Sequence, residues 1–567
     1  MALHTEPGQA PLEEEEEEEV VEELDDAPAH HPYAPPDELF DISTTVDPSY
    51  IISLIRKLLP TDASNDDNSQ GFDACVARSD HVEGSAASVS GNGVLNSLDN
   101  KAEGMDIVED CGNARQGGED EESCHGFDRP GILAGEEVWE ECGCILWDLA
   151  ASKANAELMV QNLILEVLSV NLMVSQSVRV KEICLGIIGN LACHEALLKH
   201  IVSTNGLIEI VVDQLFLDDA QCLCEACRLL TLGLQSSECI TWAEALQSEH
   251  IVSRILWVVE NTLNLQLIEK SVGLSLAIIE SQPDVLHVLL PPLMKLGLPS
   301  LLVNLLTFEM SKLMNERIPD RYSILDVVFR AIEGLSALDG HSQEICSNKE
   351  LFKLACDMVK LPDKVEVANS CVTAAVLIAN ILSEVTDLAS EISEDFPFLQ
   401  GLLDVFPFAS DDLEARSALW SIISRVLVQV RENEMNQSSL FQYVSVLVSK
   451  SDLIEDDLLD YRLDDFSRGH EGLTTSCTKS NARTTALRRI IGILNQWTAS
   501  KGSAEENDMK GELPTDDVNV NRLLDCCRKY LDGALSSVTG IEELESPYGM
   551  HEKIVSEDGG NNNIALE

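Results

Sequence analysis

One pattern of hydrophobic and polar positions recurs along most of the chain, from about residue 131 to residue 500. Within each recurrence apolar residues return three and four positions apart, which is typical of α-helices and not of strands. Two runs, CILWDLA at 144–150 and GIIGNLA at 186–192, begin 42 residues apart. A third run, VLIANIL at 376–382, has the same form. Helical repeats of this length predict an armadillo- or HEAT-like array.

The repeats predict an all-α fold, an armadillo/HEAT-like α-solenoid of about seven to nine units over 131–500. A unit of two or three helices cannot bury its apolar face alone, so neighbouring units stack and share one core. Small residues such as Gly186, Gly189 and Ala379 allow the helix backbones to approach closely. Aromatic residues make up only 5% of the chain, which also favours stacked helices over a β-sandwich.

Residues 1–130 have a different texture and are predicted to form an acidic, mostly disordered region. They include the run Glu13–Glu19 and a stretch rich in Gly, Ser, Asn and Asp, which cannot bury enough apolar surface to fold. One helix is expected at 47–60, with Asp47 as its N-cap, Pro48 in its first turn and Pro60 as its stop. A helix this short is unstable alone. We therefore expect it to dock on the solenoid, where it could cover the binding surface, or on a partner.

The C-terminal part departs from the repeat pattern twice. Residues 451–482 are acidic and then rich in Gly, Ser and Thr, which predicts a mobile insertion. Helix is expected to return at 484–497. Beyond the repeats, residues 501–567 are expected to contain a linker, a short helix at 518–531 and a disordered tail.

The chain carries a formal net charge of −60, which repels nucleic acid and anionic membranes and attracts basic proteins. Its 17 cysteines, many of them inside apolar helical runs, indicate free thiols in a reducing compartment. The apolar stretch 289–308 is interrupted by prolines and a lysine, so no membrane span is expected. Together these features predict an intracellular protein of the nucleus, the cytoplasm or both.

The segments ECGCILWDLA at 141–150 and KEICLGIIGNLAC at 181–193 resemble the serum amyloid A-like (SAAL) family. The resemblance is strongest over about 136–200. It implies an armadillo-type helical protein with an acidic region before the repeats. It also implies a non-enzymatic, nuclear or nucleocytoplasmic factor linked to cell proliferation.

No catalytic, cofactor or metal site is expected. His194 and His200 are six positions apart, so the two imidazoles would not share one helical face. Cys222, Cys224 and Cys227 lack a second Cys or His pair at the spacing of a zinc site, and core packing is the favoured interpretation. An enzyme would need a cluster of titratable residues in one pocket, which the sequence does not indicate.

Partner binding is therefore assigned to the solenoid surface. In armadillo proteins an asparagine near the end of the third helix can bond to the backbone of an extended peptide, and Asn190 and Asn380 occupy that position, with Asp148 in the first unit. The alternative is a capping or inter-repeat hydrogen bond. Trp420 is followed four residues later by Ser424, which departs from the Trp–Asn pattern of import receptors.

Two functions of different classes follow from these patterns. The preferred one is a protein–protein interaction scaffold whose groove or ridge holds a protein or peptide partner. The alternative is an acidic transport or chaperone-like factor for basic proteins, which binds through charge and therefore weakens steeply in salt.

Overall fold

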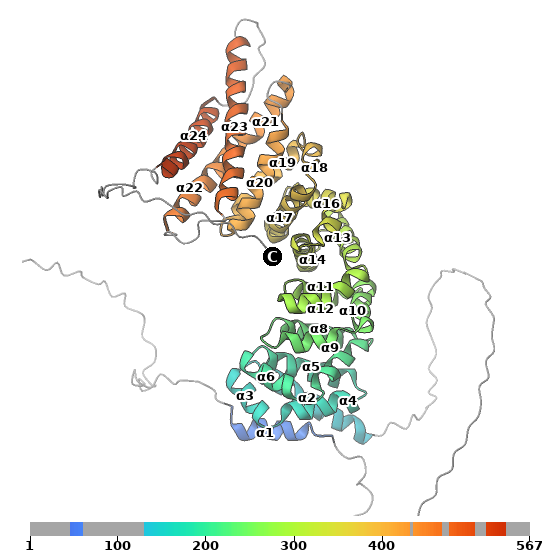
Figure 1. Ribbon diagram of the computed structural model, residues 1–567. Coiled ribbons are helices and arrows are strands. Elements are labelled where there is room, and N and C mark those ends of the chain that lie inside the picture. Colours follow the sequence, from blue (N-terminus) through green and yellow to red (C-terminus); the bar gives the residue numbers. More distant parts are fainter. Residues whose placement is uncertain (1–45, 61–129, 431–434, 468–475, 505–516, 540–567) are drawn as a thin grey trace, which may run out of the picture.

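The computed structural model describes residues 46–60, 130–430, 435–467, 476–504 and 517–539. These residues form α-helices and short 3₁₀ helices, and they contain no β-strand. The helices stack side by side into a curved array, so the predicted α-solenoid is confirmed (Figure 1).

Several sequence predictions fall outside the described residues. They are the disorder of the acidic N-terminal region at 1–45 and 61–129, the Gly/Ser-rich part of the expected insertion at 468–475, most of the linker at 505–516, and the tail at 540–567.

One helix of each unit packs on the corresponding helix of the next unit. We call these the ladder helices. They are α2 (Pro130–Leu149), α5 (Val178–Ala192), α8 (Ala220–Leu234), α11 (Leu265–Ile279), α14 (Tyr322–Ala337), α17 (Ala368–Glu384), α20 (Leu413–Gln429) and α23 (Ser476–Ala504). Each repeated sequence run described above lies in a ladder helix. In the middle of the array, α11, α14 and α17 lie nearer the inner side of the curve than α10, α13 and α16 (Figure 1).

Two further α-helices lie between each ladder helix and the next, so the described residues contain seven three-helix units. These helices are α3 (Lys153–Gln161), α4 (Ile164–Val174), α6 (Glu195–Ser203), α7 (Leu207–Asp213), α9 (Cys239–Leu246), α10 (Glu249–Asn261), α12 (Pro283–Lys295), α13 (Leu298–Asn315), α15 (Ser342–Cys346), α16 (Lys349–Val359), α18 (Leu388–Glu391), α19 (Phe396–Leu403), α21 (Gln437–Ser449) and α22 (Ser451–Ser467). The short 3₁₀ helices η2 (Gln214–Phe216), η3 (Pro319–Arg321), η4 (Val365–Val367) and η5 (Phe406–Ala409) join some of them.

Three consecutive ladder helices begin with a polar N-cap. The side chains of Ser177, Asp219 and Asn264 each accept a hydrogen bond from a backbone N–H in the first turn of α5, α8 and α11, respectively. Such a cap satisfies an N–H group that has no partner inside the helix and is worth about 1 kcal/mol. The caps fix where each ladder helix begins, and therefore help to set the register between neighbours.

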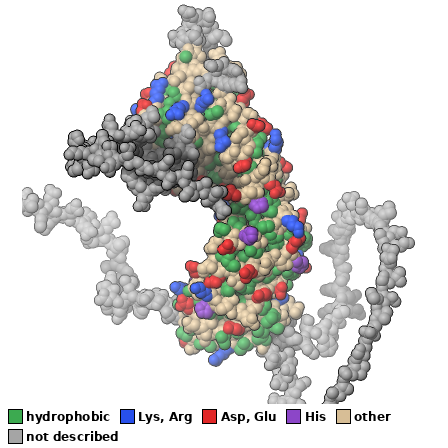
Figure 2. All heavy atoms as spheres, in the orientation of Figure 1, with side chains coloured by type: hydrophobic (Ala, Val, Ile, Leu, Met, Phe, Trp, Pro, Cys, Tyr) green, Lys and Arg blue, Asp and Glu red, His purple; other side chains and the backbone are tan. Residues whose placement is uncertain are grey.

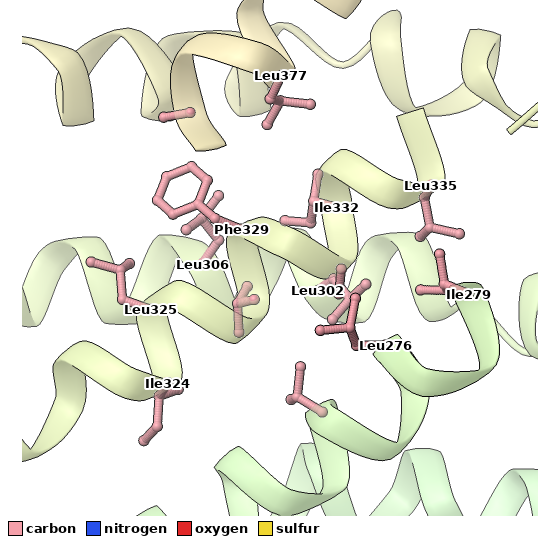
Figure 3. Close-up of a cluster of buried hydrophobic side chains, with 14 of the residues drawn as sticks. Leu276, Ile279, Leu302, Leu306, Ile324, Leu325, Phe329, Ile332, Leu335 and Leu377 are labelled. Atoms are coloured by element: carbon pink, nitrogen blue, oxygen red, sulfur yellow. The ribbon is translucent and has the colours of Figure 1, made fainter. Parts of the chain in front are cut away.

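A continuous hydrophobic core runs through the array from Ile51 to Cys527. Figure 3 shows its middle part, where side chains from α11, α13, α14 and α17 meet. Phe329 and Ile332 of α14, for example, are fully buried. Burying one such side chain completely is worth about 1.5–3 kcal/mol.

The helix expected at 47–60 is α1 (Pro48–Lys57), and the Asp47 side chain accepts a hydrogen bond from Ser49 N at 2.8 Å. It packs on α2 and α3 across the N-terminal end of the array (Figure 1). The backbone oxygen of Leu58 accepts hydrogen bonds from Trp139 Nε1 at 3.2 Å and Asn171 Nδ2 at 2.9 Å. The helix therefore covers the end of the stack, as capping elements of repeat proteins do. Because α1 packs on α2 and α3, it does not cover the groove between α8, α11 and α14 that is described below, and the hypothesis that it covers the binding surface is wrong for that groove.

The expectation of a loop-like insertion at 451–482 is wrong where the structure describes it. Residues 451–467 form α22, the second of the two helices between α20 and α23, and α23 begins at Ser476. Ile454, Asp457 and Leu458 are buried, whereas Asp456 and Leu459 are exposed. Because an acidic residue faces inward and a leucine faces outward, the helix has almost no amphipathic signal in its sequence.

The C-terminal end of the array is covered by α24 (Asp517–Thr539), which includes the helix expected at 518–531. It packs on α21, α22 and α23 and buries Val520, Leu523 and Cys527.

Ladder helix α17 is unusually apolar. Together with η4 it is long and apolar enough to cross a membrane by length and composition, with a mean hydropathy of 1.7, and two bent helix pairs pass the same test. By length and composition, the expectation that no segment could span a membrane is therefore wrong. The segment lies between α14 and α20, and 56% of it is buried inside the array, so packing already accounts for its apolar residues.

Candidate partner-binding groove

The ladder helices α8, α11 and α14 border a groove with a volume of about 380 Å³ in the middle of the array. Arg228 lies on the α8 side, Gly273 and Leu276 on the central helix, and Asp326 on the α14 side. Hydrophobic and acidic side chains lie next to each other on the face of the array that Figure 2 shows. The groove itself is lined by both apolar and charged residues, so it offers both kinds of surface to a ligand.

Two of the three carboxylates that line the groove have cationic partners. Glu269 is paired with Lys270 at 2.9 Å and accepts a hydrogen bond from Ser323 Oγ at 2.7 Å. Burial acts to raise the pKa of Glu269, but these hydrogen bonds hold it below its ordinary value. Glu280 is paired with Arg330 at 2.8 Å.

The third carboxylate, Asp326, has one oxygen that is not satisfied. Its Oδ1 atom is buried and has no hydrogen-bond partner among the described residues. Burial raises the pKa of Asp326, and the nearby Arg330 guanidinium opposes this rise. A buried acceptor without a donor costs about 1–3 kcal/mol, so a ligand that supplies a donor here would recover that free energy.

Gly273 leaves an open notch in the central helix of the groove. A Cβ atom built at this position would meet no heavy atom within 4 Å. The ladder glycines Gly186 and Gly189 are different, because a Cβ there would overlap the ring of Trp147 and the guanidinium of Arg228, respectively. The protein thus fills these two notches with its own side chains and leaves the notch at Gly273 empty.

The structure places the predicted asparagines in contacts between ladder helices. Asn190 Nδ2 donates to Trp147 O at 2.9 Å, and Asn380 Nδ2 donates to Ser336 Oγ at 3.0 Å. Asp148 is exposed near the end of α2. These geometries match the alternative of inter-repeat hydrogen bonds. Partner binding by Asn190, Asn380 and Asp148 stays a prediction, and none of the three lies in the groove at Gly273.

A second hollow of about 440 Å³ lies between α4, α6 and α7. It is lined mostly by apolar groups, such as Val170, Met173 and Ile210. No buried polar atom without a partner is found among its lining residues. It therefore offers less specificity than the groove at Gly273.

The cysteines near the groove are packing residues. Cys222, Cys224 and Cys227 are buried, and the described residues contain no group of His, Cys, Asp or Glu side chains that could hold a metal ion. Burial raises the pKa of Cys227 to about 12. A thiol with such a pKa is neutral near pH 7 and is therefore a poor nucleophile.

Thiol labelling should follow this difference in burial. With iodoacetamide at pH 8, we expect Cys193, which is exposed, to react first and Cys227 to react only after unfolding. A pKa raised from 9.0 to about 12 lowers the thiolate fraction of Cys227 at pH 8 by about a thousandfold. Peptide mass spectrometry over time measures both sites. Equal rates for the two cysteines in the native protein would contradict the burial of Cys227.

Gly273 and Asp326 were not among the residues predicted from the sequence. The one signal available was a glycine in the interior of a helical run, since glycine weakens a helix by about 1 kcal/mol relative to alanine and usually has a packing or functional reason. Asp326 gave no signal, because an acidic residue on a helix is most often on a solvated face.

Two curated proteins are similar to part of the chain. Human protein SAAL1 is 29% identical over 161 residues, and zebrafish protein saal1 is 28% identical over 133 residues. Part of this helical repeat chain is therefore similar in sequence to SAAL proteins. The alignments cover 28% and 23% of this chain, and the chain covers 32% of the human protein and 28% of the zebrafish protein. No family model matches the chain.

Solved structures with a similar helix arrangement include an engineered protein, which is 15% identical with a TM-score of 0.37 over 70% of this chain and 95% of that chain. A designed armadillo repeat protein in complex with the peptide (KR)4 is 13% identical, with a TM-score of 0.35 over 43% of this chain and 94% of that chain. Because both TM-scores are low, the fold assignment rests on the helix arrangement described above.

Proposed function

We propose that the chain is a non-catalytic interaction scaffold that holds a segment of a partner protein in the groove over α8, α11 and α14. The observation that carries the proposal is the groove itself, with the open notch at Gly273 between charged walls. A groove that spans three successive ladder helices suits an extended segment, because its side chains can contact successive repeats.

The net charge of −60 supports a partner with basic segments and disfavours nucleic acid and anionic membrane surfaces. The resemblance to the SAAL family supports a nuclear or nucleocytoplasmic role linked to cell proliferation.

The test is a proximity-labelling experiment in cells with the full-length chain. Wild type is compared with Gly273→Leu, which fills the notch, and with Gly273→Ala, which adds one methyl group to open space. A double variant, Asn190→Ala/Asn380→Ala, tests the predicted asparagines separately. We expect Gly273→Leu to lose a defined set of partners that wild type retains, and Gly273→Ala to weaken the same set less, because it fills less of the notch. Identical partner sets for all the folded variants would contradict binding in the groove.

The alternative function, a charge-driven carrier of basic proteins, is favoured by the acidic run Glu13–Glu19. It predicts partners that are lost between about 0.05 and 0.5 M salt, because the Debye length shrinks from more than 10 Å to a few ångströms. It also predicts loss of partners when these seven glutamates are replaced by glutamine. Partners held in the groove would retain most of their affinity in both experiments.

A further inference from the structure

The protein contains an internal precedent for what fills a notch at a ladder glycine. The guanidinium of Arg228 on α8 occupies the position beside Gly189 where a Cβ would lie. Its Nη2 atom donates to the backbone oxygen of Gly186 at 3.2 Å, and Glu225 pairs with it at 2.6 Å. A flat cation that packs on a glycine, donates to an oxygen and is balanced by a carboxylate thus already occurs between α5 and α8, at the edge of the groove.

The notch at Gly273 provides the same elements without the cation. Ser323 of α14 is hydrogen-bonded to Glu269 of α11, which lies 54 positions earlier in the chain. Gly273 of α11 and Asp326 of α14 line the same groove. The open space at Gly273 and the unsatisfied Oδ1 atom of Asp326 therefore belong to one part of the groove.

The cations that line the groove do not complete this arrangement. Lys270 is paired with Glu269, Arg330 with Glu280, and Arg228 with Glu225. Among the described residues, no hydrogen-bond donor reaches the Oδ1 atom of Asp326. An anionic ligand would face this carboxylate and is disfavoured.

We propose that an arginine side chain of the partner segment fills the notch at Gly273 and donates a hydrogen bond to Asp326. The guanidinium is planar, carries five N–H donors and is weakly hydrated, so it can lie flat on a helix backbone and also bind a carboxylate. Its apolar stem can pack along Leu276 and Val327, which line the same groove. This inference rests on the proposed function and specifies the side chain that the groove selects.

The test measures binding of a fluorescein-labelled Gly-Ser peptide with three arginines to the full-length chain by fluorescence anisotropy. A peptide with citrulline at the same positions has nearly the same shape and no charge. We expect the arginine peptide to bind at least about tenfold more tightly, since charge-assisted hydrogen bonds are roughly twice as strong as neutral ones. Asp326→Asn and Gly273→Leu should each weaken the arginine peptide by about tenfold.

One control variant separates this site from general attraction to an acidic protein. Asp339→Asn removes one exposed charge in the loop after α14. It should bind the arginine peptide like wild type, and circular dichroism confirms that each variant is folded. Equal losses for Asp326→Asn and Asp339→Asn would overturn the inference in favour of diffuse charge attraction.

The remaining outcomes also decide the question. If the arginine and citrulline peptides bind equally and Gly273→Leu weakens both, the groove binds peptides without selecting arginine, so the inference fails while the proposed function stands. If neither peptide binds wild type, the inference fails, and the proximity-labelling comparison of Gly273→Leu with Gly273→Ala decides the proposed function independently.

Discussion

Replacing Asp457 with alanine is expected to destabilise the C-terminal part of the array by about 3–5 kcal/mol, because it removes a buried carboxylate that pairs with the buried arginines Arg416 and Arg483. Asp457 lies in α22, and its Oδ1 and Oδ2 atoms accept hydrogen bonds from Arg416 Nε and Trp420 Nε1, both at 2.7 Å. Its backbone oxygen accepts a third bond from Arg416 Nη2 at 2.7 Å. The side chains of Arg416 and Asp457 are only 2% and 4% exposed, so water cannot replace the lost partner.

The neighbouring acid provides a matched control. Asp456 is exposed, so Asp456→Ala makes the same chemical change and should alter stability by less than about 0.5 kcal/mol. A double variant, Arg416→Met/Asp457→Leu, removes the Arg416–Asp457 pair and should recover part of the loss, although Arg483 stays buried. Urea denaturation and hydrogen exchange of α20 and α22 measure these effects. If Asp457→Ala and Asp456→Ala unfold at the same urea concentration, the buried pair does not hold α22 in place.

The second large effect is expected at Gly186, where α5 approaches α2 closely. A Cβ at this position would overlap three atoms of the Trp147 ring, which is a rigid neighbour held between the two ladder helices. Gly186→Ala should therefore destabilise the protein by about 1–3 kcal/mol through overpacking, despite the better helix propensity of alanine.

Gly273→Ala is the matched comparison, because the same substitution is made in another ladder helix with open space around it. It should stabilise the protein by about 0.5–1 kcal/mol, since only the helix propensity changes. Differential scanning fluorimetry compares the two variants directly. A lower melting temperature for Gly273→Ala than for Gly186→Ala would contradict the description of the notch at Gly186 as filled by Trp147 and the notch at Gly273 as empty.

The sequence predicted the parts of the fold that depend on local patterns. The repeated runs at 144–150, 186–192 and 376–382 identified three ladder helices, because each combines a helical period with small residues at the contact positions. The helix at 47–60 could be recognised from its cap and its apolar spacing. Helix α22 could not, because an acidic residue is among its buried positions, and the decisive contact of Asp457 is with Arg416, 41 positions away.

The candidate site was less predictable for the same physical reason. The asparagines at 190 and 380 were found by their place in a repeated motif, but whether they bond to a partner or to the adjacent helix depends on how closely the helices pack. The groove at Gly273 depends on the difference between repeats, namely that no tryptophan or arginine fills this notch. A difference of this kind arises from the packing of side chains that are far apart in sequence, and the repeat pattern hides it.

The position of the groove also bears on how the array resists opening. In a stack held together by contacts between neighbours, units at the two ends fray first and units in the middle open least often. A ligand that bridges α8, α11 and α14 would have to dissociate before these three helices could separate. Binding would therefore slow hydrogen exchange in the central units and leave exchange at the two ends unchanged, with an abrupt change in exchange rate on either side of the bridged helices.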